Sequence, residues 1–403
     1  MHAEKCLYPF LTVTFVSLVI VISAISGFLV SSSFFYQQQA SISPPLLLRG
    51  PSYPPSFAYY ISGGRGDRDR IIRLLCAVYH PRNVYLLHLS TDASEWERDG
   101  LAKLALLAVP AFRVFGNVHV VGKSDPNTHM GSTVLAATLH AASVMLKLDD
   151  RWDWFVTLSA SDYPLVTQDD LSHVFSSVPR TLNFIDHSSN LGWKEKERVE
   201  PIVVDPATYL ARRAQIFHAT EKRKTPKSFK FFTGSPWMIL NRSFIEFCIL
   251  GWDNLPRTLL LYFTNVMISQ EGYFHSVICN SNEFKNTTIN SDLRYMKWDV
   301  PPQMDPRYLN SSDYDDIEMS GAPFARQFRK NDPVLNKIDE KILRRTYGAV
   351  PGAWCSGQRS FWADPCSKWR NVNIIRPGPR AEKFEMLMKS YFEEWHLNSS
   401  SCN

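Results

Sequence analysis

The chain has 403 residues, of which 45% are hydrophobic and 21% charged, and its formal net charge is +5. This is the composition of a globular protein, and the length allows two domains or one large α/β domain. The mild positive charge forms no basic stripe, so nucleic-acid binding is not expected, although such a charge suits a small anionic substrate.

An apolar stretch begins near the N-terminus. Phe10 to Val30 is interrupted only by Thr, Ser and Gly. As a helix, about 21 residues span roughly 31 Å, which is enough for a bilayer core. We expect a cytosolic tail at residues 1–9 and an uncleaved signal anchor at residues 10–32, since cleaved signal peptides usually have a shorter apolar region. Cleavage near residues 31–33 is the alternative, and Lys5 weakly supports a lumenal location for the rest of the chain.

Cysteines and sequons agree with a lumenal location. Six of the seven cysteines follow the expected anchor, and an oxidising compartment permits disulfides. Cys355 and Cys366 flank a short aromatic loop and are the preferred pair, and Cys248 with Cys279 is a second pairing to consider. The cysteines lack CxxC spacing, so no zinc site is expected. Four sequons could carry N-glycans: Asn241, Asn286, Asn310 and Asn398.

The segment between the anchor and residue 57 differs in composition from the rest of the chain. Residues 33–56 are rich in Gln, Ser and Pro without an amphipathic period, which indicates a stem that holds the folded part away from the membrane. We expect one domain at residues 57–395, followed by a short C-terminal tail at residues 396–403.

Strands and helices alternate in the first part of this domain. Apolar runs predict strands at 57–62, 84–89, 118–121, 154–158 and 182–185. Helical spacing lies between them at 71–78, 96–109 and 134–148. Thr167 with Asp170 resembles a capping box that opens a further helix. The alternation predicts a Rossmann-like α/β domain with a mostly parallel sheet, in which ligands bind at the carboxyl ends of the strands.

The loops at those strand ends hold small and polar residues. They are 63–66, 90–92 and 159–164. The glycine cluster at 63–66 lacks the spacing of a dinucleotide fingerprint, so a nicotinamide enzyme is not expected. A Ser-His-Asp hydrolase is not expected either, because its nucleophile elbow is missing.

A polar region follows residue 186. Trp193, Lys194 and Arg198 belong either to a solvated face or to a loop that offers a stacking platform and cations to a sugar. Further on, Trp237 lies where a small-residue loop enters an apolar strand. We assign these four residues to an acceptor site.

Glu271 stands at the mouth of an apolar and aromatic segment, 273–277. A partly desolvated carboxylate has a raised pKa and can act as a general base near neutral pH. The alternative is a solvated glutamate in the first turn of a helix, stabilised by the helix N-terminus.

Two Asp-x-Asp tripeptides, 67–69 and 313–315, have a form that can hold a divalent metal on a diphosphate. The first lies in a highly charged early helix and the second in a polar loop, so we expect no metal role for either. Arg294 and Arg326 can instead neutralise a leaving diphosphate as fixed charges.

Four ordered motifs resemble glycosyltransferase family 14. They lie at 74–81, 158–165, 269–277 and 320–328. That family includes core 2/I-branching N-acetylglucosaminyltransferases, peptide xylosyltransferases and a plant branch with β-glucuronosyltransferases of arabinogalactan. Segments near the C-terminus resemble the plant branch: 354–355, 364–366 and 376–379.

The resemblance implies a type II Golgi membrane protein with a GT-A-like fold. It implies inverting, metal-independent transfer from a UDP-sugar to a glycan hydroxyl, with glucuronic acid as the expected sugar and a galactan or arabinogalactan as the acceptor. A glucuronate carboxylate would need a cation, for which Arg65, Lys194 and Arg198 are candidates. Glu271 matches the family's general base and Arg294 the arginine that contacts the diphosphate. We assign these residues to the donor site: Ser62, Gly63, Ser90, Asp162, Arg294, Arg326 and Gln327.

Two positions depart from the family pattern. Gln327 replaces a lysine that contacts the diphosphate, with Arg326 beside it, and Ser90 replaces an aspartate that often faces the nucleoside. These departures leave alternatives open: N-acetylglucosaminyl or xylosyl transfer, or a catalytically weak homologue that binds glycans. A membrane-anchored lectin-like module is disfavoured, because lectins are mostly all-β. The oligomeric state does not follow from the sequence.

Overall fold

The computed structural model describes residues 45–209, 215–346, 348–356 and 364–397, together with residues 21 and 402. Residues 45–403 form one compact unit. Apart from Val21, the expected tail and anchor lie outside the described residues, as does the Asn398 sequon. Within the described ranges, no helix is both long and apolar enough to cross a membrane.

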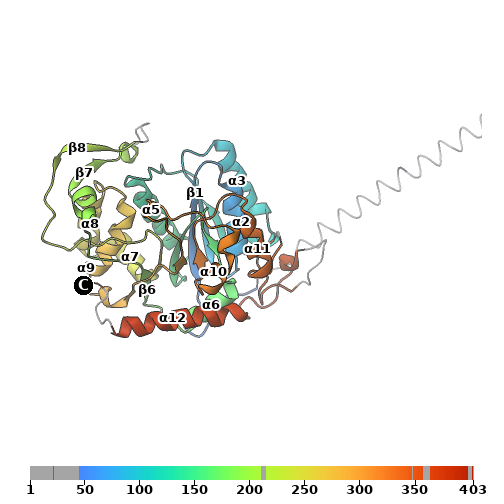
Figure 1. Cartoon of the computed structure of the whole chain (residues 1–403). Coiled ribbons are helices and arrows are strands. Elements are labelled where there is room, and N and C mark those ends of the chain that lie inside the picture. Colours follow the sequence, from blue (N-terminus) through green and yellow to red (C-terminus); the bar gives the residue numbers. More distant parts are fainter. Residues whose placement is uncertain are drawn as a thin grey trace, which may run out of the picture. The chain divides into compact units, whose positions relative to one another are not determined.

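A seven-stranded sheet forms the centre of the unit (Figure 1). Its spatial order is β10-β6-β9-β4-β1-β2-β3. Strand β9 is antiparallel to both neighbours, and the other pairs are parallel, which confirms the mostly parallel sheet. The strands are β1 (Phe57–Gly63), β2 (Val84–Leu89), β3 (Val118–Val120), β4 (Trp154–Ser159), β6 (Asn183–Ile185), β9 (Met238–Asn241) and β10 (Thr288–Ile289).

Helices cover the sheet on both faces. On one face Tyr59 and Ile61 pack in a cluster with α2, α3, α6, α11 and α12; on the other, Ala58 and Tyr60 pack with α5, α7, α8 and α9. This alternation follows from the two-residue period of a strand that is buried on both faces. The helices are α2 (Arg68–Val78), α3 (Glu95–Leu107), α4 (Pro110–Phe115), α5 (Thr133–Leu148), α6 (Gln168–Ser176), α7 (Arg242–Leu250), α8 (Asn254–Phe263), α9 (Tyr273–Asn280), α10 (Tyr314–Met319), α11 (Pro333–Lys341) and α12 (Pro379–Leu397).

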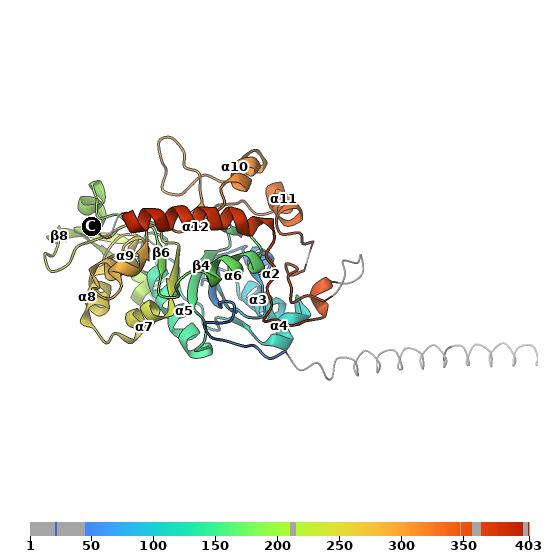
Figure 2. The ribbon, with the colours of Figure 1, turned by 90° about the horizontal axis from the view of Figure 1, so that it is seen from below.

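The capping box expected at Thr167 is present. Its hydroxyl accepts a hydrogen bond from Asp170 N at 3.1 Å, and the Asp170 carboxylate accepts one from Thr167 N at 3.1 Å, which starts α6. Figure 2 shows the long helix α12 beside α6, where Phe384 packs against Phe175.

The described residues also form two smaller sheets. In the first, β11 (Arg294–Tyr295) joins β12 (Phe324–Ala325) and β5 (Tyr163–Pro164). A hairpin of β7 (Pro201–Val204) and β8 (Phe217–Lys222) arises in the polar region. Every residue of β8 is exposed, so no buried face produces a period in the sequence.

The segment expected as the stem contacts the folded unit. Ser56 N donates to Asp153 Oδ2 at 2.8 Å, Leu48 N donates to Asn373 Oδ1 at 2.8 Å, and Arg49 pairs with Asp149 at 3.4 Å. The folded unit therefore begins at residue 45, earlier than the expected domain start.

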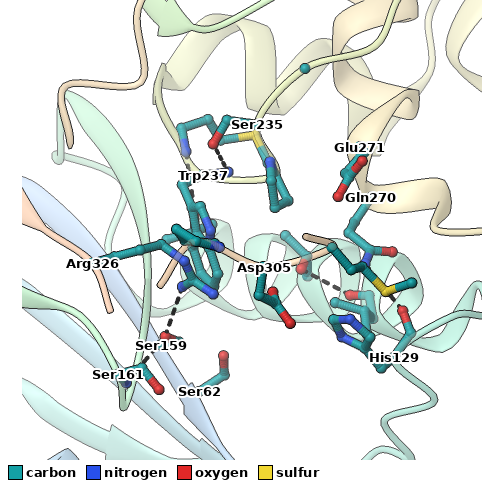
Figure 3. A pocket seen from close by; sticks show the side chains of 18 of the residues that line it. Ser62, His129, Ser159, Ser161, Ser235, Trp237, Gln270, Glu271, Asp305 and Arg326 are labelled. Carbon is teal, nitrogen blue, oxygen red and sulfur yellow. Dashed lines mark hydrogen bonds between the residues drawn. The ribbon is translucent and has the colours of Figure 1, made fainter. Parts of the chain in front are cut away.

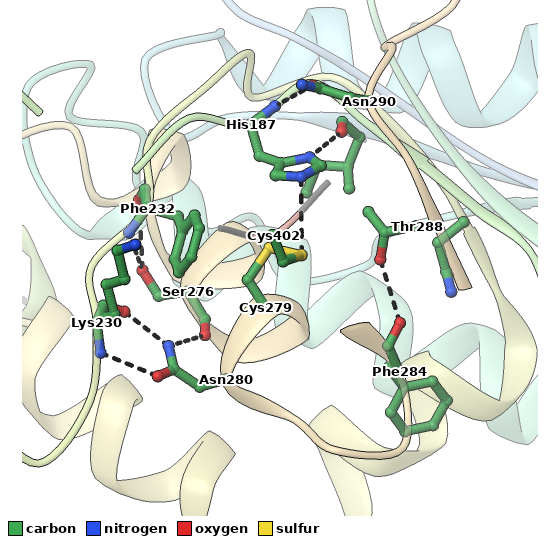
Figure 4. The surroundings of a disulfide bond; sticks show 12 residues. His187, Lys230, Phe232, Ser276, Cys279, Asn280, Phe284, Thr288, Asn290 and Cys402 are labelled. Atoms are coloured by element: carbon green, nitrogen blue, oxygen red, sulfur yellow. Dashed lines mark hydrogen bonds between the residues drawn. A yellow bond between two sulfur atoms is a disulfide. The ribbon is translucent and has the colours of Figure 1, made fainter. Parts of the chain in front are cut away.

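Two disulfides are present in the described residues. The Cys355–Cys366 prediction is confirmed, whereas the pairing of Cys248 with Cys279 is wrong: Cys279 on α9 bonds Cys402, and Cys248 is a free thiol. Figure 4 shows Cys402 beside His187, whose Nε2 lies 3.7 Å from its sulfur. Because the sulfurs of Cys279 and Cys402 are bonded to each other, the group of His187 and these two cysteines offers no thiolate to a metal. The disulfide ties the chain end to α9.

The four sequons have different environments. Asn286 and Asn310 are exposed. Asn241 is 2% exposed and caps α7, where its side chain accepts a hydrogen bond from Phe244 N at 2.7 Å and donates to the Thr181 carbonyl. A glycan on Asn241 would prevent this packing, so the expectation of glycosylation there is corrected.

Candidate active site

A pocket of about 1030 Å³ lies at the carboxyl ends of β1, β2 and β4. This is the end of the sheet where the α/β pattern placed a ligand site, and the volume suits a ligand larger than a simple sugar. Loops after β6 and before β9, the turn that holds Glu271, and a loop at residues 296–306 complete its walls.

One end of the pocket presents a fixed cation. Arg326 Nη1 donates to Asp162 Oδ1 at 2.9 Å and to Ser159 Oγ at 3.2 Å, and its guanidinium carbon lies 4.2 Å from the centre of the Trp237 ring (Figure 3). Asp162 is fully buried and also accepts from Ser159 N at 2.7 Å. The pairing and the stacking hold the guanidinium in one place, with Trp237 as part of the wall.

Of the expected donor-site residues, Ser62 and Gly63 also line the pocket. Gly63 allows a close approach of the chain: a Cβ there would lie 2.8 Å from Asp67 Cβ and 3.2 Å from Ala160 Cβ. Asp162 does not line the pocket and acts only through Arg326.

The two positions that depart from the family pattern do not reach the pocket. Ser90 is 2% exposed and its hydroxyl donates to Asp92. Gln327 Nε2 donates to the Pro306 carbonyl at 2.7 Å and so holds the loop at residues 296–306. Both expected donor contacts are therefore corrected, because internal hydrogen bonds already use these side chains.

Arg294 lies behind the pocket wall. It donates to the carbonyls of Asp292 at 2.7 Å and Thr157 at 2.6 Å, and its guanidinium is 5.7 Å from the Trp237 ring. Burial lowers its pKa, although Asp162 and Asp292 oppose that shift. Arg294 does not line the pocket, so the expected direct contact with a diphosphate is corrected; Arg294 instead adds positive charge behind Trp237.

The other end of the pocket presents a carboxylate. Glu271 ends a short 3₁₀ turn that precedes α9. Its Oε2 accepts a hydrogen bond from Arg198 Nη1 at 2.6 Å, and its side chain is 21% exposed. Its backbone oxygen accepts from Gly234 N at 3.0 Å, which joins the turn to the loop before β9. Glu271 is thus neither a lone desolvated carboxylate nor a freely solvated one, since Arg198 neutralises one of its oxygens.

Three of the four expected acceptor residues lie around this carboxylate. Arg198 belongs to a π-helical turn, Glu195–Val199, and its guanidinium lies 5.2 Å from the ring of Trp193. Trp193 is exposed and Lys194 half-buried, and both line the pocket. Burial lowers the pKa of Lys194, which Glu271 and Asp186 oppose. The structure therefore brings Trp193, Lys194 and Arg198 together with Glu271, whereas Trp237 lines the same pocket at the Arg326 end.

Sequence reasoning missed several lining residues. The loop at 296–306 contributes Trp298 and Asp305, and Figure 3 shows Asp305 between the Arg326 and Glu271 ends. The prolines at 301, 302 and 306 predict a loop there, but no local pattern says that it covers a pocket. Tyr60 and His88 also line the pocket, although their strands suggested core positions.

Three of the four carboxylates in the Asp-x-Asp tripeptides are already engaged, and the fourth, Asp315, is exposed. Asp67 accepts from Gly64 N at 3.0 Å and pairs with Arg70 at 2.9 Å, and Asp69 pairs with Arg68 at 2.8 Å. The buried Asp313 pairs with Lys297 and Arg307. These carboxylates serve helix starts and ion pairs in the structure.

Comparison with known proteins gives a consistent assignment. A family model described as "Branch: Core-2/I-Branching enzyme" matches residues 57–318. The chain is 48% identical over 368 residues to beta-glucuronosyltransferase GlcAT14A of Arabidopsis thaliana, covering 90% of this chain and 81% of that protein. It is 47% identical to GlcAT14B (86% and 80% covered) and 44% identical to GlcAT14C (90% and 89% covered), two beta-glucuronosyltransferases of the same plant. The chain therefore belongs to the Core-2/I-branching enzyme family of glycosyltransferases.

Proposed function

We propose that this protein transfers glucuronic acid from UDP-glucuronate to a hydroxyl of a galactan or arabinogalactan-type glycan, with inversion, so that a β-linkage forms. The observation that carries the proposal is one pocket with a carboxylate, Glu271, at one end and a fixed cation, Arg326, at the other. The three plant relatives, each named a beta-glucuronosyltransferase, support glucuronate as the transferred sugar.

The reaction assigns one role to each end. Glu271 accepts the proton of the acceptor hydroxyl while that oxygen attacks the anomeric carbon of the donor sugar. The bond between this carbon and the diphosphate oxygen breaks on the opposite face of the ring. Arg326 stabilises the negative charge that develops on the departing UDP. Trp193 offers an exposed aromatic face to the acceptor glycan at the rim.

The Arg198–Glu271 pair belongs in this scheme. The hydrogen bond from Arg198 engages Oε2, so the carboxylate can take the proton on Oε1 while Arg198 stays in place. Arg198 thereby orients the base, and its contact with Trp193 links that orientation to the rim where the acceptor binds.

Lys194 is the cation that we assign to the donor carboxylate. Lys194 and Arg198 line the pocket, whereas Arg65 is exposed and bonds the Asp92 backbone oxygen at 3.1 Å. Arg198 is already paired with Glu271, which leaves Lys194 for a second anion. Its half-buried position strengthens such a pairing, because screening by water is reduced.

Metal-independent transfer and a location in the Golgi membrane complete the proposal. Metal independence is supported by the cations at the pocket and by the ion pairs that engage Asp67, Asp69 and Asp313. A type II orientation is supported by the apolar segment at 10–32, the two disulfides and the exposed sequons at Asn286 and Asn310. Protection of the domain from protease in sealed vesicles, lost when detergent is added, checks the orientation.

The experiment that tests the function uses the full chain in detergent with a panel of UDP-sugars, arabinogalactan oligosaccharides and EDTA. We expect β-linked product with UDP-glucuronate alone. Turnover with UDP-xylose or UDP-N-acetylglucosamine instead would overturn the donor assignment and keep the mechanism. A folded protein that binds UDP but turns over no donor would favour the weak homologue that binds glycans.

A further inference from the structure

Tyr60 on β1 and His88 on β2 form a buried polar pair in the pocket wall. Tyr60 is 4% exposed and His88 2% exposed, and both line the pocket. Tyr60 Oη lies 2.9 Å from His88 Nδ1. Buried positions on a strand usually carry hydrocarbon side chains. A buried phenol and a buried imidazole therefore need hydrogen-bond partners.

The direction of this hydrogen bond follows from a second one. The backbone N–H of Asp125 donates to His88 Nε2 at 3.2 Å, so Nε2 carries no proton. Burial lowers the pKa of His88, which keeps the ring neutral. The single ring proton therefore sits on Nδ1 and is donated to Tyr60 Oη.

The phenol then has a proton to give. Burial raises the pKa of Tyr60, so the hydroxyl stays protonated. Its oxygen accepts from His88, and among the residues that the structure describes there is no acceptor for its own hydrogen. A buried hydroxyl that lines a pocket and donates to no protein atom can donate its hydrogen bond to an acceptor on a ligand.

The order of strands in the sheet indicates which part of a bound ligand lies near Tyr60. Across the sheet the order is β9, β4, β1, β2. The Glu271 turn contacts the loop before β9, Arg326 bonds Ser159 at the end of β4, and the Tyr60–His88 pair lies on β1 and β2. A nucleotide sugar with its sugar at Glu271 and its diphosphate at Arg326 therefore places its nucleobase toward Tyr60.

We propose that the Tyr60 hydroxyl donates a hydrogen bond to the 4-carbonyl oxygen of uracil and thereby selects UDP over CDP. This rests on the proposed function. Cytosine carries an amino group at the same ring position, so with CDP two donors would face each other. His88 is the positioning residue, because it supplies the hydrogen bond that turns the Tyr60 proton outward.

The test measures dissociation constants of UDP and CDP by calorimetry with the full chain in detergent. We expect the wild type to prefer UDP. Tyr60→Phe should raise the dissociation constant of UDP by about tenfold and leave that of CDP within about threefold. The preference for UDP over CDP should therefore be lost. The ratio of the two constants is independent of the fraction of folded protein, which protects the test if the variant is less stable.

Tyr59→Phe is the matched control. Tyr59 is the neighbouring residue on β1, but its hydroxyl donates to Gln168 Oε1 at 3.0 Å on the other face of the sheet. Loss of the Tyr59 hydroxyl should leave the ratio of the UDP and CDP dissociation constants unchanged. Parallel weakening of both nucleotides by Tyr60→Phe, or a wild type without preference, would overturn the inference and leave the proposed function standing. A wild type that binds neither nucleotide would overturn the proposed function as well.

Discussion

The two ends of the pocket hold their charges differently. Arg326 is locked by buried Asp162, Ser159 and the Trp237 ring. Glu271 is held by Arg198, which comes from a π-helical turn and stacks on the exposed ring of Trp193. One charge is fixed by buried neighbours and the other by a partner near solvent.

This difference matches the two tasks that we propose. A charge that stabilises a leaving group works best when it is already in position, because no reorganisation is then needed. A base must exchange a proton with an arriving hydroxyl, so its partner needs room to adjust. Substitutions at each end can show whether the two ends contribute separately to donor binding and to proton transfer.

The largest effect is expected at the base. Glu271→Gln keeps the size of the side chain but removes the proton acceptor, so kcat should fall by about 10³-fold while the UDP dissociation constant stays within about twofold. Initial rates and calorimetry measure the two quantities. Glu246→Gln is the control, because it changes another glutamate paired with an arginine, at 2.8 Å on α7. A Glu271→Gln enzyme within tenfold of wild-type turnover would remove the base assignment.

The fixed cation should act on the diphosphate. Arg326→Met should lower kcat/KM by about 10²-fold and weaken UDP while leaving uridine, which lacks the phosphates, nearly unaffected. Arg329→Met is the control, since Arg329 stacks on Tyr308 and does not line the pocket. Equal weakening of UDP and uridine would mean that the variant damages the fold around Asp162 rather than a phosphate contact.

A carboxyl remote from both ends should control stability. Burial raises the pKa of Asp169 to about 6, although bonds from Ala353 N and Arg376 N oppose the shift. Between about pH 4 and 6 the folded protein keeps this proton and the unfolded chain does not. The contribution of Asp169 to the free energy of unfolding should therefore fall by about 3 kcal/mol as pH rises through that window. Burial lowers the pKa of His80 and of His275 to about 3, so these two groups contribute the opposite trend, and the Asp169 contribution is the difference between the wild type and a variant without this carboxyl.

Asp169→Asn should remove this pH dependence and leave the pocket chemistry unchanged. Denaturant unfolding at pH 4.5 and pH 7 measures the free energy of unfolding of the wild type and the variant. Asp150→Asn is the control, because that carboxyl is 82% exposed. If the wild type and both variants lose stability equally between the two pH values, the assignment to Asp169 is wrong.

The smallest effect is expected at the partner of the base. Arg198→Met should lower kcat/KM for the acceptor by about tenfold, roughly the value of one charge-assisted hydrogen bond, with UDP binding unchanged. Lys196→Met changes an exposed cation on the same turn and should have little effect. If Arg198→Met weakens UDP as strongly as Arg326→Met does, the separation of the two ends fails.

Much of the fold could be predicted because its signals are local. Apolar runs placed the strands β1, β2, β3, β4 and β6, and the cap at Thr167 placed α6. Cys355 and Cys366 could be paired because only 11 residues separate them. Strand β8 was missed, since its exposed residues leave no period to detect, and its partner β7 has only four residues.

The candidate site was predicted in part. Glu271, Arg326, Ser62, Gly63 and the four acceptor residues do line one pocket. Ser90 and Gln327 do not, because internal hydrogen bonds use their side chains. The sequence identifies which residue types are available at a strand end but not which internal partner will engage them.

By itself, the sequence determined the alternation of strands and helices, the end of the sheet at which the pocket lies, and the carboxylate and arginine that suit group transfer. Only the tertiary structure decided that Arg198 pairs with Glu271, 73 residues away, that Cys279 bonds Cys402, 123 residues away, and that Asn241 is buried. Secondary structure follows from side-chain periods over a few residues, whereas these contacts arise when distant loops pack together, and no short stretch of sequence encodes that packing.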